Sequence, residues 1–306
     1  MDARITKQRL ANMLSYDWLK IVGAIALAAV AFCVFFLMIA TTPTAGQTFY
    51  VYAYDGLTGG MDFSRLNNEF ENKNIFSYDI LKTGSETFSN NGMYGGTVFT
   101  ARRSAGEGRV MFVSDVRTTD EEGNVSSPLL GFLDRAGTEQ ENFGMFTDPK
   151  VFLGETETYL QRFFGDALSS EEPNGDATRS AFMERNGKDK RYRSAAKKEE
   201  GVLEEALRLK KLREDYLFVK AAVGGGTLGY VTYTGFEEKE HVVGFSMKSL
   251  NLTSLVFYTV EEEGTEVKKN DDIALCIFNN GDREGDLKYE TVNFLAYLLR
   301  TYGTQK

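Results

Sequence analysis

The sequence is poor in the residues that carry covalent and metal chemistry. Its 306 residues include 2 cysteines, 1 histidine, 1 tryptophan and 4 prolines. Cys33 lies inside a long apolar run, so Cys276 has no partner for an intramolecular disulfide in the rest of the chain. Zinc sites need several Cys or His ligands, so we expect neither a metal nor another cofactor. The formal net charge of −9 argues against nucleic acid as a partner.

Charged residues are also absent from residues 21–40, IVGAIALAAVAFCVFFLMIA. A helix of about 20 apolar residues spans the hydrocarbon core of a bilayer. We therefore expect a transmembrane helix, preceded by a cytoplasmic tail at 1–20 and followed by a linker at 41–47. Basic residues precede the helix, and the first one after it is Arg65, which predicts a cytoplasmic N-terminus and an extracellular C-terminal domain.

A cleaved signal peptide and a lipoprotein are the alternatives to a retained signal anchor. The apolar run is longer than the roughly 7–15 residues of a signal peptide. Pro43 also occupies a position where the cleavage site needs a small residue, and Phe32 precedes Cys33 where a lipobox needs one. We therefore expect a single-pass protein of the cell membrane, held in the lipid bilayer by residues 21–40.

Residues 48–306 are expected to form one extracytoplasmic α/β domain. Three strands are predicted at 48–54, 75–83 and 109–116, with helices between them at 61–73 and 95–108. Strands alternating with helices predict right-handed crossovers and a mainly parallel or mixed sheet.

The second half of this domain begins with helical patterns and continues in short strands. Helices are predicted at 128–137, 156–168, 202–223 and 289–303, and strands at 230–236, 241–247, 252–262, 267–273 and 274–280. In the charged helical segment 181–223, Val202, Leu209, Tyr216 and Val223 lie seven residues apart and form one apolar stripe. We expect this stripe to pack on its own domain, and docking on another protein is the alternative.

Catalytic motifs are weak. His241 would have to support any Ser-His-Asp or Cys-His system alone, and the acidic segment around it predicts a half-exposed strand residue instead. Ser194-Ala-Ala-Lys197 and Lys82-Thr83-Gly84 match two motifs of penicillin-binding proteins, but in the reverse chain order. We therefore expect that the protein is not an enzyme.

Two further motifs fit local turns better than ligand sites. GGGTLG at 224–229 has the G-x-G-x-x-G spacing of nucleotide-binding loops, but a predicted helix precedes it and a strand follows, so we expect a helix end. Asn280, Asp282 and Glu284 resemble the start of an EF-hand loop, but Thr291 stands where the loop needs a bidentate Glu. We expect a solvated turn there.

Polar and tyrosine side chains occur at several predicted strand ends and turns. In an open parallel sheet, ligands bind outside the carboxyl ends of the strands. The candidate ligand-binding residues are therefore Tyr54, Asp55, Ser85, Ser114, Asp115, Tyr230 and Tyr233. The alternative is that they are ordinary turn and capping residues.

The order of elements resembles a known family. TFYVYAYDGL followed by MDFSRLNNEFENK resembles the first lobe of the extracellular solute-binding proteins of ABC importers, of the type II periplasmic-binding-protein kind. RVMFVSDV resembles one of their strands, and YETVNFLAYLLRTYG resembles their late helix. The resemblance implies a two-lobed ectodomain that binds a solute and serves an importer. The lack of tryptophan after residue 18 argues against a sugar as that solute.

A second resemblance concerns the N-terminus. MLSYDWLKIVGAIALAAVAF resembles a group of uncharacterised single-pass membrane proteins of Gram-positive anaerobes. A secreted eukaryotic domain of this size usually carries several disulfides, which also favours a bacterial protein.

Three functions remain open, in this order. The first is a membrane-anchored, solute-binding-like protein of an ABC transporter. The second is an envelope interaction or scaffold protein that binds no ligand and docks on a transporter permease or another membrane partner. The third is a cell-envelope enzyme. An apolar stripe exposed on residues 202–223 would favour the second function, and a cleft lined by Tyr and Asp the first.

Overall fold

A computed structural model of the protein describes residues 7–39, 43–54, 60–72, 75–88, 95–135, 145–234 and 240–303. The chain divides into two compact units, Met1–Pro43 and Thr44–Lys306. In the first unit, α1 (Lys7–Ile39) contains the window Trp18–Phe35, with a mean hydropathy of 2.3. Of the helices in the described residues, α1 is the one long and apolar enough to cross a membrane, and it is compatible with a membrane anchor.

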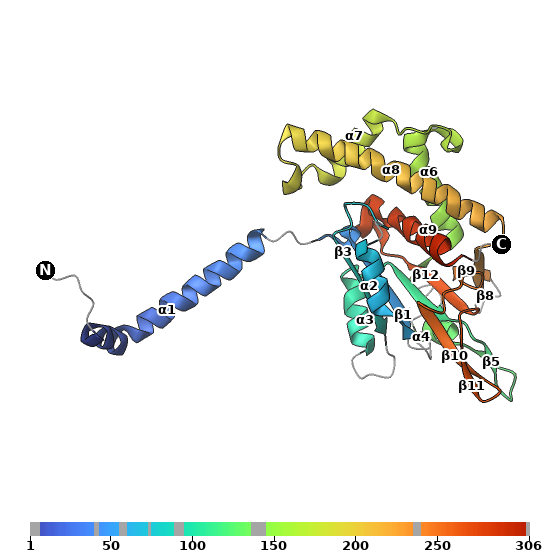
Figure 1. Ribbon diagram of the computed structural model, residues 1–306, viewed down its shortest axis with the longest axis horizontal. Coiled ribbons are helices and arrows are strands. Elements are labelled where there is room, and N and C mark those ends of the chain that lie inside the picture. The colour runs from blue at the N-terminus through green and yellow to red at the C-terminus, as the bar shows by residue number, and fades with distance from the viewer. Residues whose placement is uncertain are drawn as a thin grey trace. The chain divides into compact units, whose positions relative to one another are not determined.

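The second unit is built on a mixed sheet (Figure 1). Its strands are β1 (Thr48–Tyr54), β3 (Lys82–Phe88), β4 (Val110–Ser114), β7 (Phe146–Thr147), β8 (Gly229–Thr234), β9 (Glu240–Ser246) and β12 (Ile273–Phe278). Their order is β3-β1-β4-β12-β9-β8, and β7 pairs with β12. β1 is parallel to both β3 and β4, whereas the pairs that β12 makes with β4, β7 and β9 and the pair of β8 with β9 are antiparallel.

Smaller sheets extend this unit. β10 (Val256–Glu262) pairs with β11 (Thr265–Lys269) and with β2 (Gly60–Met61), while β5 (Thr118–Thr119) pairs with β6 (Val125–Ser126). The helices are α2 (Phe63–Asn72), α3 (Gly95–Ser104), α4 (Pro128–Arg135), α6 (Pro149–Phe164), α7 (Gly175–Asn186), α8 (Ala195–Gly224) and α9 (Thr291–Tyr302). Short 3-10 helices are η1 (Ala45–Gln47), η2 (Asp166–Leu168), η3 (Lys190–Tyr192) and η4 (Gly281–Glu290).

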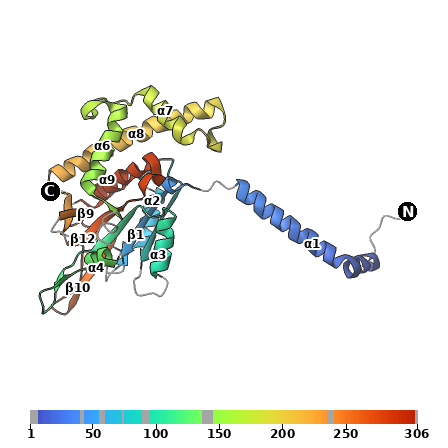
Figure 2. The same cartoon turned by 180° about the vertical axis from the view of Figure 1, so that it is seen from behind.

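The two faces of the large sheet support separate apolar clusters. Successive strand residues point to opposite faces, so Phe112 packs with α9 and α8 on one face, while Met111 and Cys276 pack with α4 on the other. α9 lies between the sheet and α8 in both views (Figures 1 and 2), and α6, α7 and α8 form an outer helical layer beyond it. The core therefore has its larger part between the sheet and this helical layer.

The sequence predicted most elements of this fold but misplaced the second strand. β1 occupies the predicted residues 48–54, and it lies beside two parallel strands as expected. The prediction of a strand at 75–83 was wrong, because β3 begins only at Lys82. Residues 75–81 form a turn instead: Ile75 packs in the core, Ile80 donates a backbone hydrogen bond to Ser77, and the Asp79 carboxylate is buried.

Local capping explains two helix starts that periodicity placed too late. α6 begins at Pro149, where the Asp148 side chain accepts a hydrogen bond from the Lys150 amide and proline fits the first turn. α8 begins at Ala195, because Ser194 Oγ accepts from the Lys197 amide. The S-x-x-K match is therefore a helix N-cap.

Candidate functional site

The predicted ligand residues at the ends of β1 and β4 have partners inside the domain. Tyr54 packs its ring against Phe132, with the ring centroids 4.9 Å apart. Ser114 is buried and its Oγ accepts a hydrogen bond from the Val116 amide. Asp115 accepts 2.7 Å from Ser127 Oγ, and this serine caps α4. Asp55 lies outside the described residues. These side chains hold the loop after β4 in place. They therefore act as ordinary turn and capping residues, which was the alternative to ligand binding.

The remaining predicted residues lie away from that edge. Ser85 is in the middle of β3, opposite Val51, and its Oγ donates 3.1 Å to Asn67. Because β3 starts later than predicted, Ser85 does not follow a strand as expected. Tyr230 and Tyr233 are both on β8, and three strands separate them from β1.

The two tyrosines of β8 also face opposite ways. Tyr230 packs against Phe245 on the face that α9 covers, and Tyr233 packs in the cluster on the other face. Neighbouring strands are about 4.8 Å apart, so four steps across the sheet separate β8 from β1 by about 19 Å. The structure therefore brings Tyr54, Ser114 and Asp115 to one edge but does not join them with Ser85, Tyr230 or Tyr233.

The other motifs have structural roles. His241 is half-buried in β9 opposite Tyr233, as predicted. α8 ends at Gly224, Gly226 has φ of 74°, and β8 starts at Gly229, which confirms a helix end followed by a strand. Among the described residues, no group of three or more His, Cys, Asp or Glu side chains is placed to hold a metal ion.

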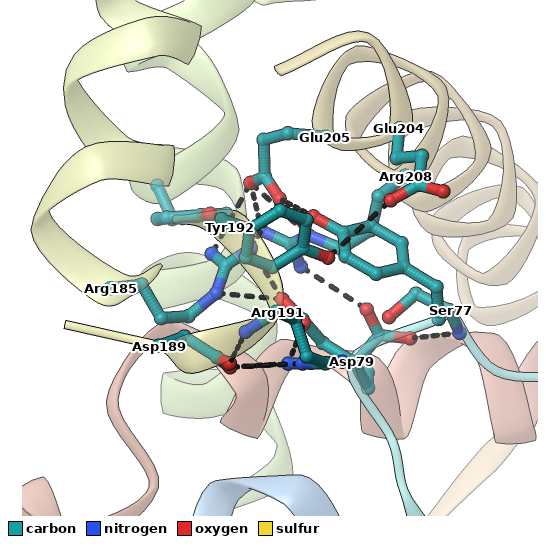
Figure 3. Close-up of polar contacts among 12 residues, drawn as sticks. Ser77, Asp79, Arg185, Asp189, Arg191, Tyr192, Glu204, Glu205 and Arg208 are labelled. Carbon is teal, nitrogen blue, oxygen red and sulfur yellow. Dashed lines mark hydrogen bonds and ion pairs between the residues drawn. The ribbon is translucent and has the colours of Figure 1, made fainter. Parts of the chain in front are cut away.

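A buried network of charged side chains is the most unusual feature of the second unit (Figure 3). We call Asp79, Arg185, Arg191, Glu205, Arg208 and Glu290 the ion network. These residues come from the 75–81 turn, α7, η3, α8 and η4. The side chains of Glu205 and Arg208 are 0% exposed. Such charges are stable in a low-dielectric interior only when they are paired and hydrogen-bonded.

Each arginine of the network bridges acids from different elements. Arg185 donates 2.9 Å to Asp79 and also pairs with Glu205 (Figure 3). Arg208 donates 2.9 Å to Glu205 and 3.1 Å to Glu290. A further 2.7 Å hydrogen bond from Arg208 reaches the Tyr159 hydroxyl on α6. The network therefore fastens the outer helical layer to the 75–81 turn and the start of α9.

The pKa of Glu205 shows that attraction outweighs desolvation in this network. Burial raises this pKa, but the charges and hydrogen bonds of Arg208 and Arg185 lower it to about 2. Burial also raises the pKa of Tyr159 to about 12, so its hydroxyl stays protonated. Glu205 is therefore ionised, saturated by guanidinium groups and shielded from solvent, which suits a structural clamp and leaves no free base or nucleophile.

A second buried ion pair, Arg109 with Glu284, lies at the start of β1. Arg109 donates 3.1 Å to the Gly46 carbonyl and 3.2 Å to the Thr48 carbonyl, so it fixes the chain where it enters the sheet. Burial raises the pKa of Glu284, and Arg109 only partly offsets this. The prediction of a solvated turn holds for Asp282, which is exposed, but not for Glu284, whose buried carboxyl group pairs with the fully buried Arg109.

An open groove lies between α6 and η4. Its volume is about 520 Å³, and it is lined by Gly154, Glu155, Thr158, Tyr159, Arg162, Asp286 and Tyr289. Tyr159 and Tyr289 stack with centroids 4.5 Å apart, and the Arg162 guanidinium lies 5.7 Å from the Tyr159 ring. This groove combines tyrosine with acidic and basic groups, but it contains none of the six predicted ligand residues that the structure describes.

The face of α8 that points away from the domain is apolar at both ends. Leu203 and Leu207 are 68% and 65% exposed, and Leu217 and Phe218 are 38% and 39% exposed. We call Leu203, Leu207, Lys210, Glu214, Leu217, Phe218 and Ala221 the outer face of α8. The predicted stripe is on the opposite, inner face, where Leu209, Tyr216 and Val219 are buried. Sequence reasoning missed the outer leucines, although the residues of this face follow each other at steps of three and four.

Comparisons with protein-family models, with curated protein sequences and with solved structures find no match for this chain. The fold and the side-chain geometry are therefore the basis for a function.

Proposed function

We propose that the protein is a membrane-anchored interaction protein that docks on a partner protein through the outer face of α8. α1 has the length and composition of a membrane span. Basic residues Arg4, Lys7, Arg9 and Lys20 accompany its N-terminal side, which favours a cytoplasmic N-terminus with the α/β domain outside the cell membrane.

The exposed leucines Leu203 and Leu207 carry the proposal. Single exposed apolar residues are common and need no partner. These two share one helix face with Leu217 and Phe218, and the inner face of the same helix is already buried in its own domain. Clustered apolar side chains on a soluble surface are typical of protein contact sites. Fully burying one leucine contributes about 1.5–3 kcal/mol, so such a face gains stability from a partner.

Site-specific photocrosslinking in membranes tests this function. A benzophenone amino acid replaces Leu207 in the full chain, and in a control it replaces Val98, which is exposed on α3. We expect a discrete protein adduct from position 207 and none from position 98. Equal labelling at the two positions, or no adduct from positions 203, 207 and 217, would overturn the docking function.

The groove beside Tyr159 supports a second candidate, a solute-binding protein. Its volume falls within the roughly 300–1,000 Å³ of small-molecule sites. Arg162 supplies a cation for an anionic group, and the stacked Tyr159 and Tyr289 supply an aromatic wall. Such a ligand would combine a carboxylate or phosphate with a planar or apolar part.

Thermal-shift screening separates the two candidates. Amino acids, peptides, sugars and nucleotides are added to the purified chain and to the Arg162→Ala variant. A ligand at a hundred times its dissociation constant stabilises the folded state by about 2.7 kcal/mol. A shift in the parent that disappears in Arg162→Ala would support solute binding. A screen without a shift would leave docking as the function.

A further inference from the structure

We infer that the partner of the outer face of α8 is a second copy of this chain, with the two α8 helices antiparallel about a two-fold axis between Lys210 and Glu214. The inference rests on the proposed docking function, because it uses the same face. It adds the identity of the partner, the direction of the helices and the register.

The spacing of the outer face is that of a helix-pairing seam. Its central residues are Leu203, Leu207, Lys210, Glu214, Leu217 and Ala221, which follow each other at alternating steps of four and three. This alternation is the a/d spacing of a heptad, in which one helix face meets another over several turns. The seam has exposed apolar residues toward both ends and one basic and one acidic residue at its centre.

Antiparallel pairing makes this seam complementary to itself. With the axis level with Leu212, facing residues lie equally far from Leu212 in opposite directions along the two helices. Leu207 therefore meets Leu217 of the second copy. Lys210 then meets Glu214 of the second copy, and the symmetry repeats this pair. A parallel pair would place Lys210 against Lys210 and Glu214 against Glu214, which is repulsive. A two-fold contact uses the same patch on both copies, as this seam requires.

The central charges are available for such a contact. Within the described residues, no ion pair or hydrogen bond engages the Glu214 side chain. Lys210 donates 2.5 Å to Glu172, but the side chain of Glu172 is 74% exposed. An exposed pair of this kind contributes little to stability. Lys210 can therefore exchange Glu172 for the glutamate of a second copy.

The charge pattern also favours a protein over a lipid surface. Helices that lie on membranes carry mainly Lys and Arg around their apolar face. The exposed residues of α8 instead include both signs, with Glu199, Glu200 and Glu214 beside Lys197 and Lys220 and the half-buried Lys210. A face with both signs of charge suits a surface that presents both signs in return, and this helix is such a surface.

A charge exchange on the full chain in detergent tests the pairing. Lys210→Glu places two acids in contact, and Glu214→Lys places two bases in contact, so each should raise the dimer dissociation constant at least tenfold. The double variant Lys210→Glu with Glu214→Lys restores opposite charges and should return to within about threefold of the parent. Sedimentation equilibrium gives the constants. Double-variant binding as weak as in the single variants would overturn the inference.

Cysteine crosslinking in membranes tests the register and is independent of any contact made by α1. In a Cys33→Ser background, Leu207→Cys with Leu217→Cys should give a disulfide-linked dimer on mild oxidation. Leu207→Cys alone should not, because equivalent positions then lie about 15 Å apart at 1.5 Å per residue. A dimer from Leu207→Cys alone would show parallel pairing and overturn the inference. Cys276 is buried and remains in all variants.

The outcomes separate this inference from the docking function. Photocrosslinked adducts at position 207 with the mass of two copies would support both the docking function and self-pairing. Adducts of another mass would keep the docking function and overturn self-pairing. The third outcome is binding of the α8 face to lipid. If vesicles protect Leu207→Cys in the full chain from a water-soluble maleimide while no dimer forms, both the docking function and self-pairing are overturned.

Discussion

The inner face of α8 buries Glu205 and Arg208, whereas its outer face leaves Leu203 and Leu207 more than half exposed. An isolated amphipathic helix would have the opposite distribution. On the inner face, α7, η4 and α6 each supply a partner for a charge. On the outer face, no element among the described residues covers the leucines. Whether a residue of α8 is buried or exposed thus depends on the partners that the rest of the fold provides for its side chain.

The comparison also distinguishes two kinds of contact. Burying these charges costs free energy unless every partner is present, so the ion network favours one packing arrangement of the helical layer on the rest of the domain. The outer leucines tolerate solvent and gain from any apolar partner of suitable shape. We therefore expect substitutions on the inner face to change folding, and those on the outer face to change association.

The largest effect is expected from Arg208→Met, which removes the cation shared by Glu205 and Glu290. Both carboxylates then remain buried without this partner, and breaking a buried ion pair costs about 3–5 kcal/mol. The free energy of unfolding should fall by this amount in urea titrations followed by circular dichroism.

Arg179→Met is the matched control. Arg179 pairs with Glu199, but the two side chains are 51% and 58% exposed, and such an exposed pair contributes little to stability. Equal losses in the two variants would mean that the ion network is no more important than a surface pair.

The pH dependence of stability should show the next largest effect. The pKa of Glu205 is lowered to about 2 from its ordinary value of 4.5, so its stabilisation is present above pH 4.5 and is lost as the pH falls toward 2. The shift corresponds to about 3 kcal/mol. Urea titrations between pH 6 and 2.5 should show this loss in the parent and a smaller one in Glu205→Gln.

Glu284 should behave in the opposite direction. Its pKa is raised by burial, so the folded state holds the proton more tightly than the unfolded state does. Its contribution is therefore full below its ordinary pKa and is lost as the pH rises through the raised value. Glu284→Gln should remove this part of the pH dependence. A smaller loss of stability in acid than that of the parent, as expected for Glu205→Gln, would contradict this prediction.

The two faces of α8 also show what the sequence could predict. The heptad spacing of Leu209 and Tyr216 correctly identified a packed stripe, because burial of apolar side chains follows local periodicity. Asp79 could not be recognised as buried, because its partners come from α7 and η3, more than a hundred residues away. The apolar residues around it instead suggested a strand. Solute binding, docking and the absence of catalysis stay predictions.

The predicted ligand residues do not form one site for a related reason. Placing Ser85 at a strand end required the boundaries of β3, and these depended on the turn that Asp79 anchors. Tyr230 and Tyr233 lie on opposite faces of a strand four places from β1, which follows from strand order and not from local pattern. Local chemistry offered a turn or capping role for Ser114 and Asp115, which the structure shows, but it could not determine which of the candidate residues meet.

A smaller effect is expected from Gly201→Ala on the inner face. A Cβ at position 201 would overlap the rings of Phe182 and Tyr192, which pack against each other with centroids 4.9 Å apart. Overpacking costs about 1–3 kcal/mol, whereas replacing a helical glycine by alanine gains about 1 kcal/mol. We expect a net loss of about 1 kcal/mol in urea titrations. Gly154→Ala on α6, where a Cβ meets no atom within 4 Å, should instead gain stability.

The smallest effect on stability is expected from the outer face. Leu203→Gln and Leu207→Gln remove apolar side chains that are already mostly solvated, so each should change the free energy of unfolding by less than about 0.5 kcal/mol. The same substitutions should weaken association, because the amide group must lose its hydrogen bonds to water when a partner covers it. Urea titration under dilute conditions and sedimentation at higher concentration measure the two quantities on the same samples. A loss of stability as large as that of Gly201→Ala would show that these leucines already pack on the domain. Unchanged association together with unchanged stability would remove the reason for treating the outer face as a contact surface.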